Sequence, residues 1–229
     1  MLSKLDASGG KDTMISTVIL CDDHKIFREG LRSLIEKQSD MKIIAEASDG
    51  RTAVRLSKEK SPDIIIMDIA MPELNGIETT HQIIKNYPKI KVLILSMYSD
   101  QRFVLKAMES GASGYLLKDS AFEELVDAIH IVLSGQIYLS PSIASIFVKS
   151  YITNLQKKDS HNLKALTDRE REVLQLLSEG KTTKQISLTL GISGKTVETH
   201  RQKIMEKLNI SSIAELTKYA LREGLTFLD

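Results

Sequence analysis

Residues 62–76 read PDIIIMDIAMPELNG, and this stretch decides the fold. Four apolar residues in succession, 64–67, lead directly into Asp68, and a loop that contains Pro72 follows. A continuous apolar run of this length is typical of a strand that is buried on both faces, as in a parallel sheet. In open α/β sheets the ligand crevice lies at the carboxyl ends of the strands, so we expect Asp68 to lie there.

Other apolar runs end in polar side chains as well. These are Asp22 and Asp23 after 18–21, Ser96 after 92–95 and Lys118 after 114–117. Taken singly, the lysine is equally well explained as a surface cation and the serine as a turn former. Together they predict a ligand-binding site, because the acids, the hydroxyl and the ammonium all follow strands at one edge of one sheet.

The composition sets outer limits on the function. The chain has 229 residues, a net charge of +1 and a pI near 7.8, so any basic surface for nucleic acid must be local. The single cysteine, Cys21, has no partner for an internal disulfide, and we expect a buried packing thiol there. Because the sequence contains neither a bilayer-length apolar run of about 20 residues nor a signal sequence, it predicts a soluble, cytoplasmic protein with no membrane partner.

Strand and helix patterns alternate through residues 16–134, after a tail at 1–15 that has no useful period. We expect strands at 17–21, 41–47, 63–68, 91–96 and 114–118, and helices at 24–37, 50–60, 76–87, 101–110 and 121–134. The first helix presents an apolar face that includes Ile26, and Ser120 with Glu123 reads as a capping box for the last helix. The alternation predicts an α/β fold with a doubly wound, flavodoxin-like, five-stranded parallel sheet.

The alternation of strand and helix patterns ends at residue 135, and the remainder of the chain has no strand pattern. Residues 135–163 form a linker with one predicted helix at 142–155, followed by a polar stretch at 156–162. Residues 164–229 read as an all-α domain, in which three capping boxes begin apolar-periodic runs: Thr167 with Glu170, Thr182 with Gln185, and Ser212 with Glu215. A short helix, a turn at Gly191 and a longer helix make a helix-turn-helix pattern.

The acidic side chains predict a particular chemistry. Carboxylates gathered in one crevice repel one another and favour Mg²⁺, which prefers oxygen ligands and commonly bridges to phosphate. Asp68 is then placed to act as a nucleophile toward a phosphoryl group, and Lys118 to neutralise charge on the transferring oxygens. Ser96 is placed to donate a hydrogen bond to one of those oxygens.

Residues 16–134 resemble the receiver domain of bacterial two-component response regulators. The matching motifs are Asp22-Asp23, the loop from Asp68 through Met71-Pro72 to Gly76, Ser96, and GYLLKD around Lys118. The resemblance implies that a sensor histidine kinase phosphorylates Asp68, with Mg²⁺ as cofactor. It also implies the following roles: Asp22, Asp23, Asp68 and the Ala70 carbonyl hold Mg²⁺, Lys118 assists catalysis, and Ser96 with Tyr115 forms the switch pair. A half-buried packing aromatic is the alternative for Tyr115.

Two positions bear on how long the phosphoryl group lasts. Ala70, two residues after Asp68, offers no side chain to orient an attacking water, and Tyr98, two residues after Ser96, is placed to crowd its path. We therefore expect a long-lived acyl phosphate, and no enzyme activity beyond the receiver's own phosphotransfer and slow dephosphorylation.

Residues 166–174, LTDREREVL, and 192–208, ISGKTVETHRQKIMEKL, resemble the NarL/FixJ class with its LuxR-type helix-turn-helix. Val197, Ile204 and Leu208 fall on one side of the predicted recognition helix and polar residues on the other, as expected of a helix that enters a major groove. We expect base contacts from Thr199, Gln202 and Lys203, and further DNA contacts from Lys184, Lys195, Thr196, His200 and Lys207. Glu198 is acidic where some relatives carry a basic residue that faces DNA. It either accepts a hydrogen bond from the amino group of a cytosine or pairs with Lys195 or Arg201.

The leading interpretation is a transcription factor that binds double-stranded DNA and forms a homodimer when phosphorylated. By resemblance, part of the last helix, 212–223, supplies a dimer contact, while Ile213, Leu216 and Leu221 read as its core positions. An aspartyl-phosphate phosphohydrolase is one alternative, but Ile69, Ala70 and Met71 leave it no second acid. A phospho-switched module for protein or RNA is another, which DNA binding and its salt dependence discriminate.

Overall fold

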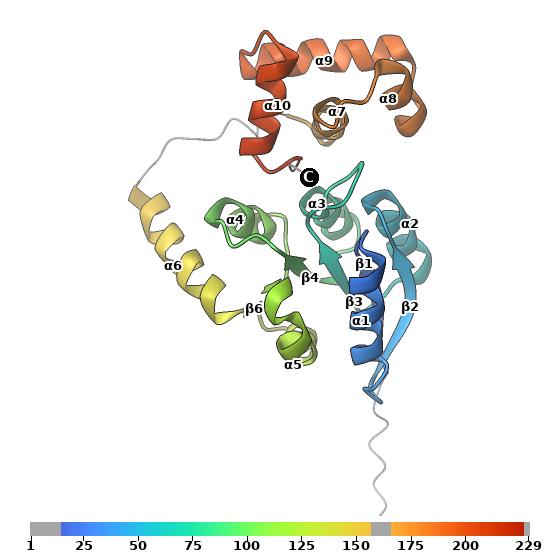
Figure 1. The fold of residues 1–229 in the computed structure, drawn as a ribbon, viewed down its shortest axis with the longest axis vertical. Helices are drawn as coiled ribbons and strands as arrows, with labels where there is room; N and C mark the ends of the chain where they lie inside the picture. The colour runs from blue at the N-terminus through green and yellow to red at the C-terminus, as the bar shows by residue number, and fades with distance from the viewer. Residues whose placement is uncertain (1–14, 157–165, 227–229) are drawn as a thin grey trace, which may run out of the picture.

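The structure is a computed structural model that describes residues 15–156 and 166–226, with the side chains of 149–156 excepted. Apart from Ile15 and Gln156, the predicted tail and the polar part of the predicted linker lie outside these ranges. A parallel sheet with helices on both faces is followed by a helical domain, as predicted (Figure 1). No helix within the described ranges combines the length and the apolar character needed to cross a membrane.

The sheet has the order β2-β1-β3-β4-β5-β6, and every neighbouring pair is parallel. Its strands are β1 (Ser16–Cys21), β2 (Met41–Ala47), β3 (Ile64–Asp68), β4 (Lys91–Ser96), β5 (Gly114–Leu117) and β6 (Tyr138–Leu139). All five residues of β3 are buried, so the apolar run is the inner strand that its composition predicts. Asp68 ends this strand at the carboxyl edge of the sheet.

Two apolar cores cover the two faces of the sheet, because successive residues of a strand point to opposite sides. Ile65 and Met67 of β3 belong to one core and Ile64 and Ile66 to the other. The helices that follow the first five strands are α1 (Lys25–Ile35), α2 (Gly50–Lys60), α3 (Gly76–Asn86), α4 (Gln101–Glu109) and α5 (Ala121–Leu133). Core residues of α2, α3 and α4 pack on the first face and those of α1 and α5 on the second, which confirms the doubly wound architecture.

The sheet has a sixth strand beyond the five that were predicted. β6 is only two residues long, too short to show a period, and it pairs with β5 through the N–H of Tyr138 and the N–H of Ser140. Helix α6 (Pro141–Gln156) follows, close to the predicted 142–155. Its residues Ile143, Ile146 and Phe147 belong to the first core or pack against it.

Two local predictions for the receiver half are wrong. Ile26 was assigned to the apolar face of α1, yet it lies 86% exposed in the first turn, where it lines an open pocket and does not belong to the second core. Ser120 does not form a capping box with Glu123. A short 3₁₀ turn (Lys118–Ser120) runs directly into α5, so the Ser120 backbone is not extended (ψ 0°) and its hydroxyl turns back to the Leu117 carbonyl.

The helical domain contains α7 (Asp168–Ser178), α8 (Thr183–Leu190), α9 (Gly194–Leu208) and α10 (Ile213–Arg222). The capping boxes at Thr167 and Thr182 form as predicted, whereas Ser212 caps α10 without the reciprocal bond from Glu215 to the cap backbone. Gly191 ends α8 in the left-handed region (φ 64°), which makes the sharp turn into α9. Ile213 is not a core residue: it is 45% exposed at the start of α10, while Leu216 is fully buried.

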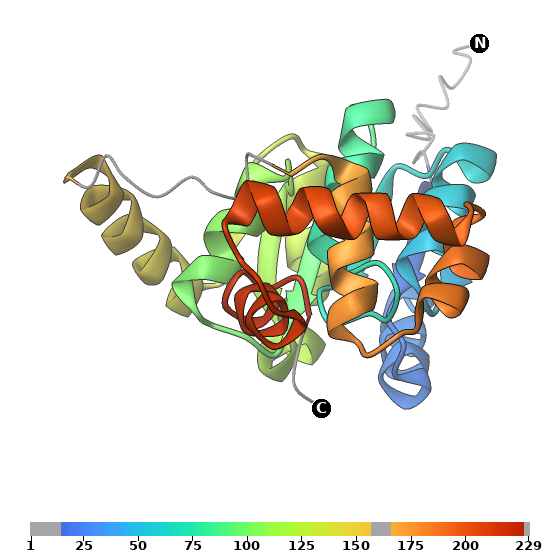
Figure 2. The same cartoon turned by 90° about the horizontal axis from the view of Figure 1, so that it is seen from above.

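The helical domain rests on the receiver through α7. Figures 1 and 2 show α7 between the receiver and α9, so α9 lies on the side turned away from the receiver. Polar side chains cross this boundary: Arg171 of α7 donates to Glu78 of α3 at 2.7 Å, and Glu172 accepts from Arg51 of α2 at 3.0 Å. Glu78 and Glu172 are nearly buried, so the boundary is a packed interface.

Candidate functional site

Three strands bring oppositely charged side chains together at the carboxyl edge of the sheet. Lys118 Nζ lies 2.6 Å from Asp22 Oδ2 and 2.9 Å from Asp68 Oδ2. The three side chains are at most 7% exposed. The structure therefore places Asp22, Asp68 and Lys118 in one buried cluster, as their positions after β1, in β3 and after β5 led us to expect.

The cluster holds two carboxylates against a single ammonium. Burial and the charge of Asp22 raise the pKa of Asp68, although Lys118 and the backbone N–H of Ala70 oppose the shift. Burial disfavours the Lys118 ammonium, but the two carboxylates outweigh it and raise the pKa of the lysine. The buried charge is incompletely balanced, which is an arrangement that favours a further cation.

The donor atoms around Asp68 fit a hard divalent cation. Asp22 Oδ2 and Asp68 Oδ2 are buried, and apart from the Lys118 ammonium no donor among the described residues hydrogen-bonds either atom. One donor atom from each of Asp22, Asp23, His24 and Asp68 lies within 4.8 Å of the others. Oxygen-rich, partly open sites of this kind suit Mg²⁺, which keeps several waters.

The loop from β3 to α3 is tightly built around Asp68. The Gly76 N–H donates to the Ile69 carbonyl at 2.9 Å, and a Cβ on Gly76 would stand 1.9 Å from the carbonyl oxygen of Asp68. Only glycine permits this approach. Asn75 then caps α3 by accepting from the Glu78 N–H, so the loop holds the start of α3 in a fixed relation to Asp68.

Ser96 and Tyr115, the predicted switch pair, are both completely buried. Ser96 Oγ accepts from the Tyr98 N–H at 2.9 Å, and the Tyr115 hydroxyl donates to the Tyr98 carbonyl at 2.6 Å. Burial raises the pKa of Tyr115 far above its ordinary value, so the phenol stays protonated and remains a donor. Tyr115 is fully buried rather than half-buried and belongs to the first core, so a packing role stands beside the predicted switch role.

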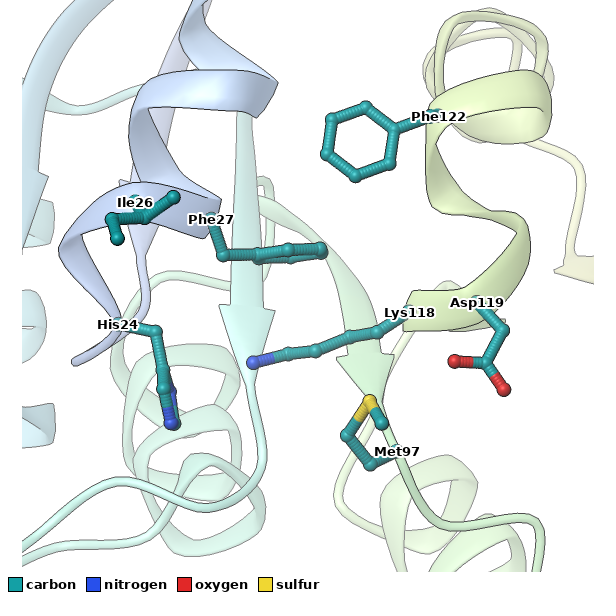
Figure 3. A pocket seen from close by; sticks show the side chains of 7 residues that line it. All are labelled: His24, Ile26, Phe27, Met97, Lys118, Asp119 and Phe122. Atoms are coloured by element: carbon teal, nitrogen blue, oxygen red, sulfur yellow. The ribbon is translucent and has the colours of Figure 1, made fainter.

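A pocket of about 560 Å³ opens beside Lys118, and sequence analysis did not predict it. Figure 3 shows the Lys118 stem between Phe27 and Met97, with the Phe122 ring above Phe27. Lys118 Nζ lies 4.8 Å from the centre of the Phe27 ring, and the two phenyl rings meet edge to face at 5.6 Å. A Cβ at Gly30 would stand 2.9 Å from the Phe122 ring, so the glycine makes room for that ring.

Three large apolar side chains around this pocket face solvent, and we call them the apolar rim. They are Ile26 (86% exposed), Met97 (64%) and Phe122 (51%). Exposed apolar groups gathered at the mouth of a charged pocket are a feature of surfaces that bind other molecules. Sequence reasoning missed this surface because Ile26 fits the core period of α1, while Met97 comes from the β4–α4 loop and Phe122 from α5.

Helix α9 presents the predicted polar face to solvent. Val197 and Ile204 are fully buried, and the exposed residues include Lys195, Thr196, Thr199, Gln202 and Lys203. Lys184 is exposed on α8. Glu198 lies 3.3 Å from Arg201 and accepts from the Thr183 hydroxyl at 2.8 Å, so here the predicted Arg201 pairing is realised.

The two remaining predicted DNA-contact residues differ in their surroundings, because Lys207 is exposed and His200 is not. His200 is half-buried, and its Nδ1 has no hydrogen-bond partner within the described part of the chain. Lys207 donates to Glu170 at 2.7 Å, which ties the end of α9 to the start of α7. Lys207 therefore already neutralises one carboxylate within the domain.

Comparisons with known proteins agree with this architecture. Residues 18–130 match the response regulator receiver domain family, and residues 164–220 match the luxR family of bacterial regulatory proteins. The chain belongs to the two-component response regulators that join a receiver to a LuxR-type helix-turn-helix DNA-binding domain. It is thus a transcription regulator rather than an enzyme in the ordinary sense.

Two relatives match nearly the whole chain, and a solved structure matches part of it. It is 34% identical over 220 residues to the transcriptional regulatory protein DegU of Brevibacillus brevis, spanning 90% of this chain and 93% of that one. It is 36% identical over 212 residues to the oxygen regulatory protein NreC of Staphylococcus carnosus, spanning 91% and 98%. A LuxR-family response regulator from Aurantimonas sp. SI85-9A1 superposes with a TM-score of 0.58 at 41% identity, over 60% of this chain and 99% of that one.

A full-length likeness exists at the level of fold. RcsB, a two-component response regulator whose structure was solved in complex with DNA, is 23% identical over 91% of this chain and 98% of its own, with a TM-score of 0.57. The order of a parallel α/β domain followed by a helical domain is therefore shared along the chain.

Proposed function

We propose that Asp68 accepts a phosphoryl group from a phosphohistidine of a sensor histidine kinase, and that this modification controls DNA binding by the C-terminal domain. The supporting observation is the buried contact of Asp68 and Asp22 with Lys118 at the carboxyl edge of the sheet. The protein acts in the cytoplasm, with a receiver at 16–134, a connection at 135–163 and a DNA-binding domain at 164–229.

In the transfer step an oxygen of the Asp68 carboxylate forms a bond to phosphorus as the bond from phosphorus to the donor's imidazole nitrogen breaks. The electron pair of the broken bond returns to that nitrogen. Lys118 turns from the carboxylates to the phosphoryl oxygens and offsets their charge. Mg²⁺, when bound by Asp22, Asp23, Asp68 and the Ala70 carbonyl, supplies further positive charge there.

The phosphoryl oxygens then recruit the switch pair. Ser96 follows Leu95, the residue of β4 that pairs with Asp68, so Ser96 lies one residue beyond the modified carboxylate on the neighbouring strand. When Ser96 donates to a phosphoryl oxygen, its bond with the Tyr98 N–H is disturbed, and Tyr115 is bonded to the same residue. The loop that carries Tyr98 therefore changes its hydrogen bonds when Asp68 is phosphorylated.

The apolar rim is the docking surface for the phosphodonor. Ile26, Met97 and Phe122 surround the opening to Lys118, so a partner helix with an apolar face would cover them and bring its histidine to Asp68. The exposed rings and side chains would gain burial only in the complex. The acidic cluster itself accepts a small phosphodonor without that contact.

DNA binding is assigned to the exposed face of α9. Thr199, Gln202 and Lys203 are placed for base contact in the major groove, and Lys184, Lys195 and Thr196 for the phosphate backbone, with His200 and Lys207 at the flanks. Two chains bind as a homodimer through α10 once Asp68 is phosphorylated.

The test is labelling of the purified protein with acetyl phosphate and Mg²⁺. We expect Asp68→Asn to abolish the label, whereas Asp119→Asn, an exposed carboxylate at the same pocket, should leave it unchanged. Equal labelling of Asp68→Asn and wild type would refute the proposal. Repeated turnover of a small phosphate ester would favour a phosphohydrolase. Absence of salt-dependent binding to duplex DNA would favour a module for protein or RNA.

A further inference from the structure

The residue at the N-cap of α1 is a histidine that does not cap the helix. The His24 side chain makes no capping hydrogen bond with the first turn. Serine, threonine, aspartate and asparagine are the residues that stabilise an N-cap, so a histidine here gives up that local gain. Such a departure from local stability marks a candidate for another role. Figure 3 shows the His24 ring below the first turn of α1, on the side of the pocket toward which the Lys118 ammonium points.

The His24 ring is held against the acid pair that precedes it. Its Nδ1 lies 2.8 Å from Asp23 Oδ1 and 3.3 Å from Asp22 Oδ1. The His24 backbone N–H donates to the same Asp22 oxygen at 2.8 Å, which turns the chain back toward the acid. Backbone and ring together therefore fix Nδ1 beside two carboxylates.

The carboxylate of Asp68 belongs to the same group. One ligand atom from each of Asp22, Asp23, His24 and Asp68 lies within 4.8 Å of the other three. Within residues 15–156 and 166–226 this is the one place where three or more acidic, histidine or cysteine side chains come close enough to share a metal ion. The histidine is thus part of the acidic site in space as well as in sequence.

The four side chains range from buried to open. The Asp22 and Asp68 side chains are at most 3% exposed, whereas Asp23 is 34% and His24 66% exposed. The buried pair faces one ammonium, that of Lys118, which leaves an excess of negative charge in a desolvated place. The exposed pair leaves this charge accessible to a cation that arrives from solvent with its waters.

An imidazole nitrogen changes which cation a carboxylate site prefers. Mg²⁺ takes oxygen ligands, whereas first-row transition-metal dications accept imidazole as well. Nδ1 binds a metal when the ring carries its hydrogen on Nε2, and a dication then takes the place of the hydrogen between Nδ1 and Asp23. The position of the ring therefore favours a cation that gains from nitrogen.

We propose that His24 is a fourth side-chain ligand of the cation that binds beside Asp68, and that it gives the site a preference for a first-row transition-metal dication over Mg²⁺. This inference rests on the proposed function for the place of the cation, and it adds the class of cation and the residue that selects it. The receiver should therefore become competent for phosphoryl transfer at a lower concentration of such a dication than of Mg²⁺.

The experiment uses Mn²⁺ with the full-length protein, because Mn²⁺ is paramagnetic and accepts both oxygen and imidazole ligands. Pulsed electron paramagnetic resonance detects a nitrogen bound to Mn²⁺, and calorimetric titration gives the affinities for Mn²⁺ and Mg²⁺. We expect a nitrogen signal in wild type and none in His24→Ala. We also expect His24→Ala to weaken Mn²⁺ binding about tenfold and to change Mg²⁺ binding by less than about twofold.

His130→Ala is the matched control. His130 is an exposed histidine that lies 2.9 Å from one carboxylate, that of Asp40, and it is not part of the group around Asp68. Its removal should change neither the nitrogen signal nor the two affinities. A nitrogen signal that persists in His24→Ala would overturn the inference. So would a Mn²⁺ affinity that His24→Ala leaves unchanged, or an equal loss of affinity for both cations.

Labelling by acetyl phosphate, with each cation in turn, separates this inference from the proposed function. In wild type we expect half-maximal labelling at about tenfold less Mn²⁺ than Mg²⁺, and in His24→Ala a difference of no more than about threefold. Labelling of Asp68 without a nitrogen signal from His24 would overturn the inference and leave the phosphoacceptor standing. A nitrogen signal that depends on His24, with no labelling of Asp68 by either cation, would count against the proposed function and support the cation site.

Discussion

Replacing Lys118 by methionine isolates the electrostatics of the site. Lys118 is within 2.9 Å of both Asp22 and Asp68, so the variant leaves two buried carboxylates facing each other without a counter-charge. Removing one partner of a buried ion pair costs about 3–5 kcal/mol, and proton uptake by Asp68, whose pKa is already raised, limits the loss to the lower end of that range. We therefore expect the receiver to lose about 3 kcal/mol without Mg²⁺.

The loss should depend on Mg²⁺. A cation bound by Asp22, Asp23 and Asp68 replaces the missing positive charge, so Mg²⁺ should stabilise Lys118→Met more than it stabilises wild type. At a typical urea m-value of about 2 kcal/mol/M, the midpoint falls by about 1.5 M without Mg²⁺ and recovers largely with it. Hydrogen exchange of the β3 amides across a urea series reports the receiver alone.

Controls define what this result means. Lys58→Met removes an ammonium from the last turn of α2 and should shift the midpoint by no more than a few tenths of a molar. Asp22→Asn combined with Lys118→Met removes one of the repelling charges and should regain part of the loss. A Lys118→Met receiver as stable as wild type without Mg²⁺, or one that Mg²⁺ does not favour, would refute the electrostatic reasoning.

Three further predictions concern the rim, the phosphoryl lifetime and the helical domain. Phe122→Ser should slow phosphotransfer from a histidine kinase about tenfold while labelling by acetyl phosphate stays within twofold; an equal loss in both assays would contradict docking at the rim. Ala70→Asn should shorten the acyl-phosphate half-life about tenfold, measured as loss of label, and a wild-type half-life of seconds would contradict the expected long lifetime. Although burial opposes it, Lys207 and the Thr167 N–H lower the pKa of Glu170. The contribution of Glu170 to the stability of the helical domain is therefore present above the ordinary carboxyl pKa and is lost as pH falls through the lowered pKa. Thermal unfolding of the helical domain between about pH 6 and about pH 3 measures this loss. It should be about 1 kcal/mol in wild type and absent in Glu170→Gln.

The acidic site can be predicted from the sequence, because its residues stand where apolar strands end. Asp68 and Lys118 each follow an apolar run, and parallel pairing brings such ends to one edge whatever the helices do. The strand-end argument also places Ser96 near Asp68, because Ser96 follows Leu95, the residue that pairs with Asp68. Period and strand ends are local signals, and they were sufficient here.

The features that the sequence did not reveal depend on contacts between distant residues. β6 has two residues and exists only because β5 offers an open edge to pair with. The apolar rim joins α1, the β4–α4 loop and α5, and Ile26 on its own resembles a core position. The hydrogen bond from Asn75 Nδ2 to the Leu225 carbonyl joins residues that are 150 positions apart, and no periodicity encodes such a partner.

The sixth strand has a practical consequence for work with the isolated receiver. A fragment that stops at residue 134 keeps every residue of the acidic cluster but leaves the outer backbone groups of β5 without the bonds that Tyr138 and Ser140 supply. Bare strand borders recruit other chains, so such a truncated fragment is prone to self-association that the intact protein does not share. A cut after α6 preserves both the border and the helix whose Ile143 belongs to the same apolar core as Tyr115.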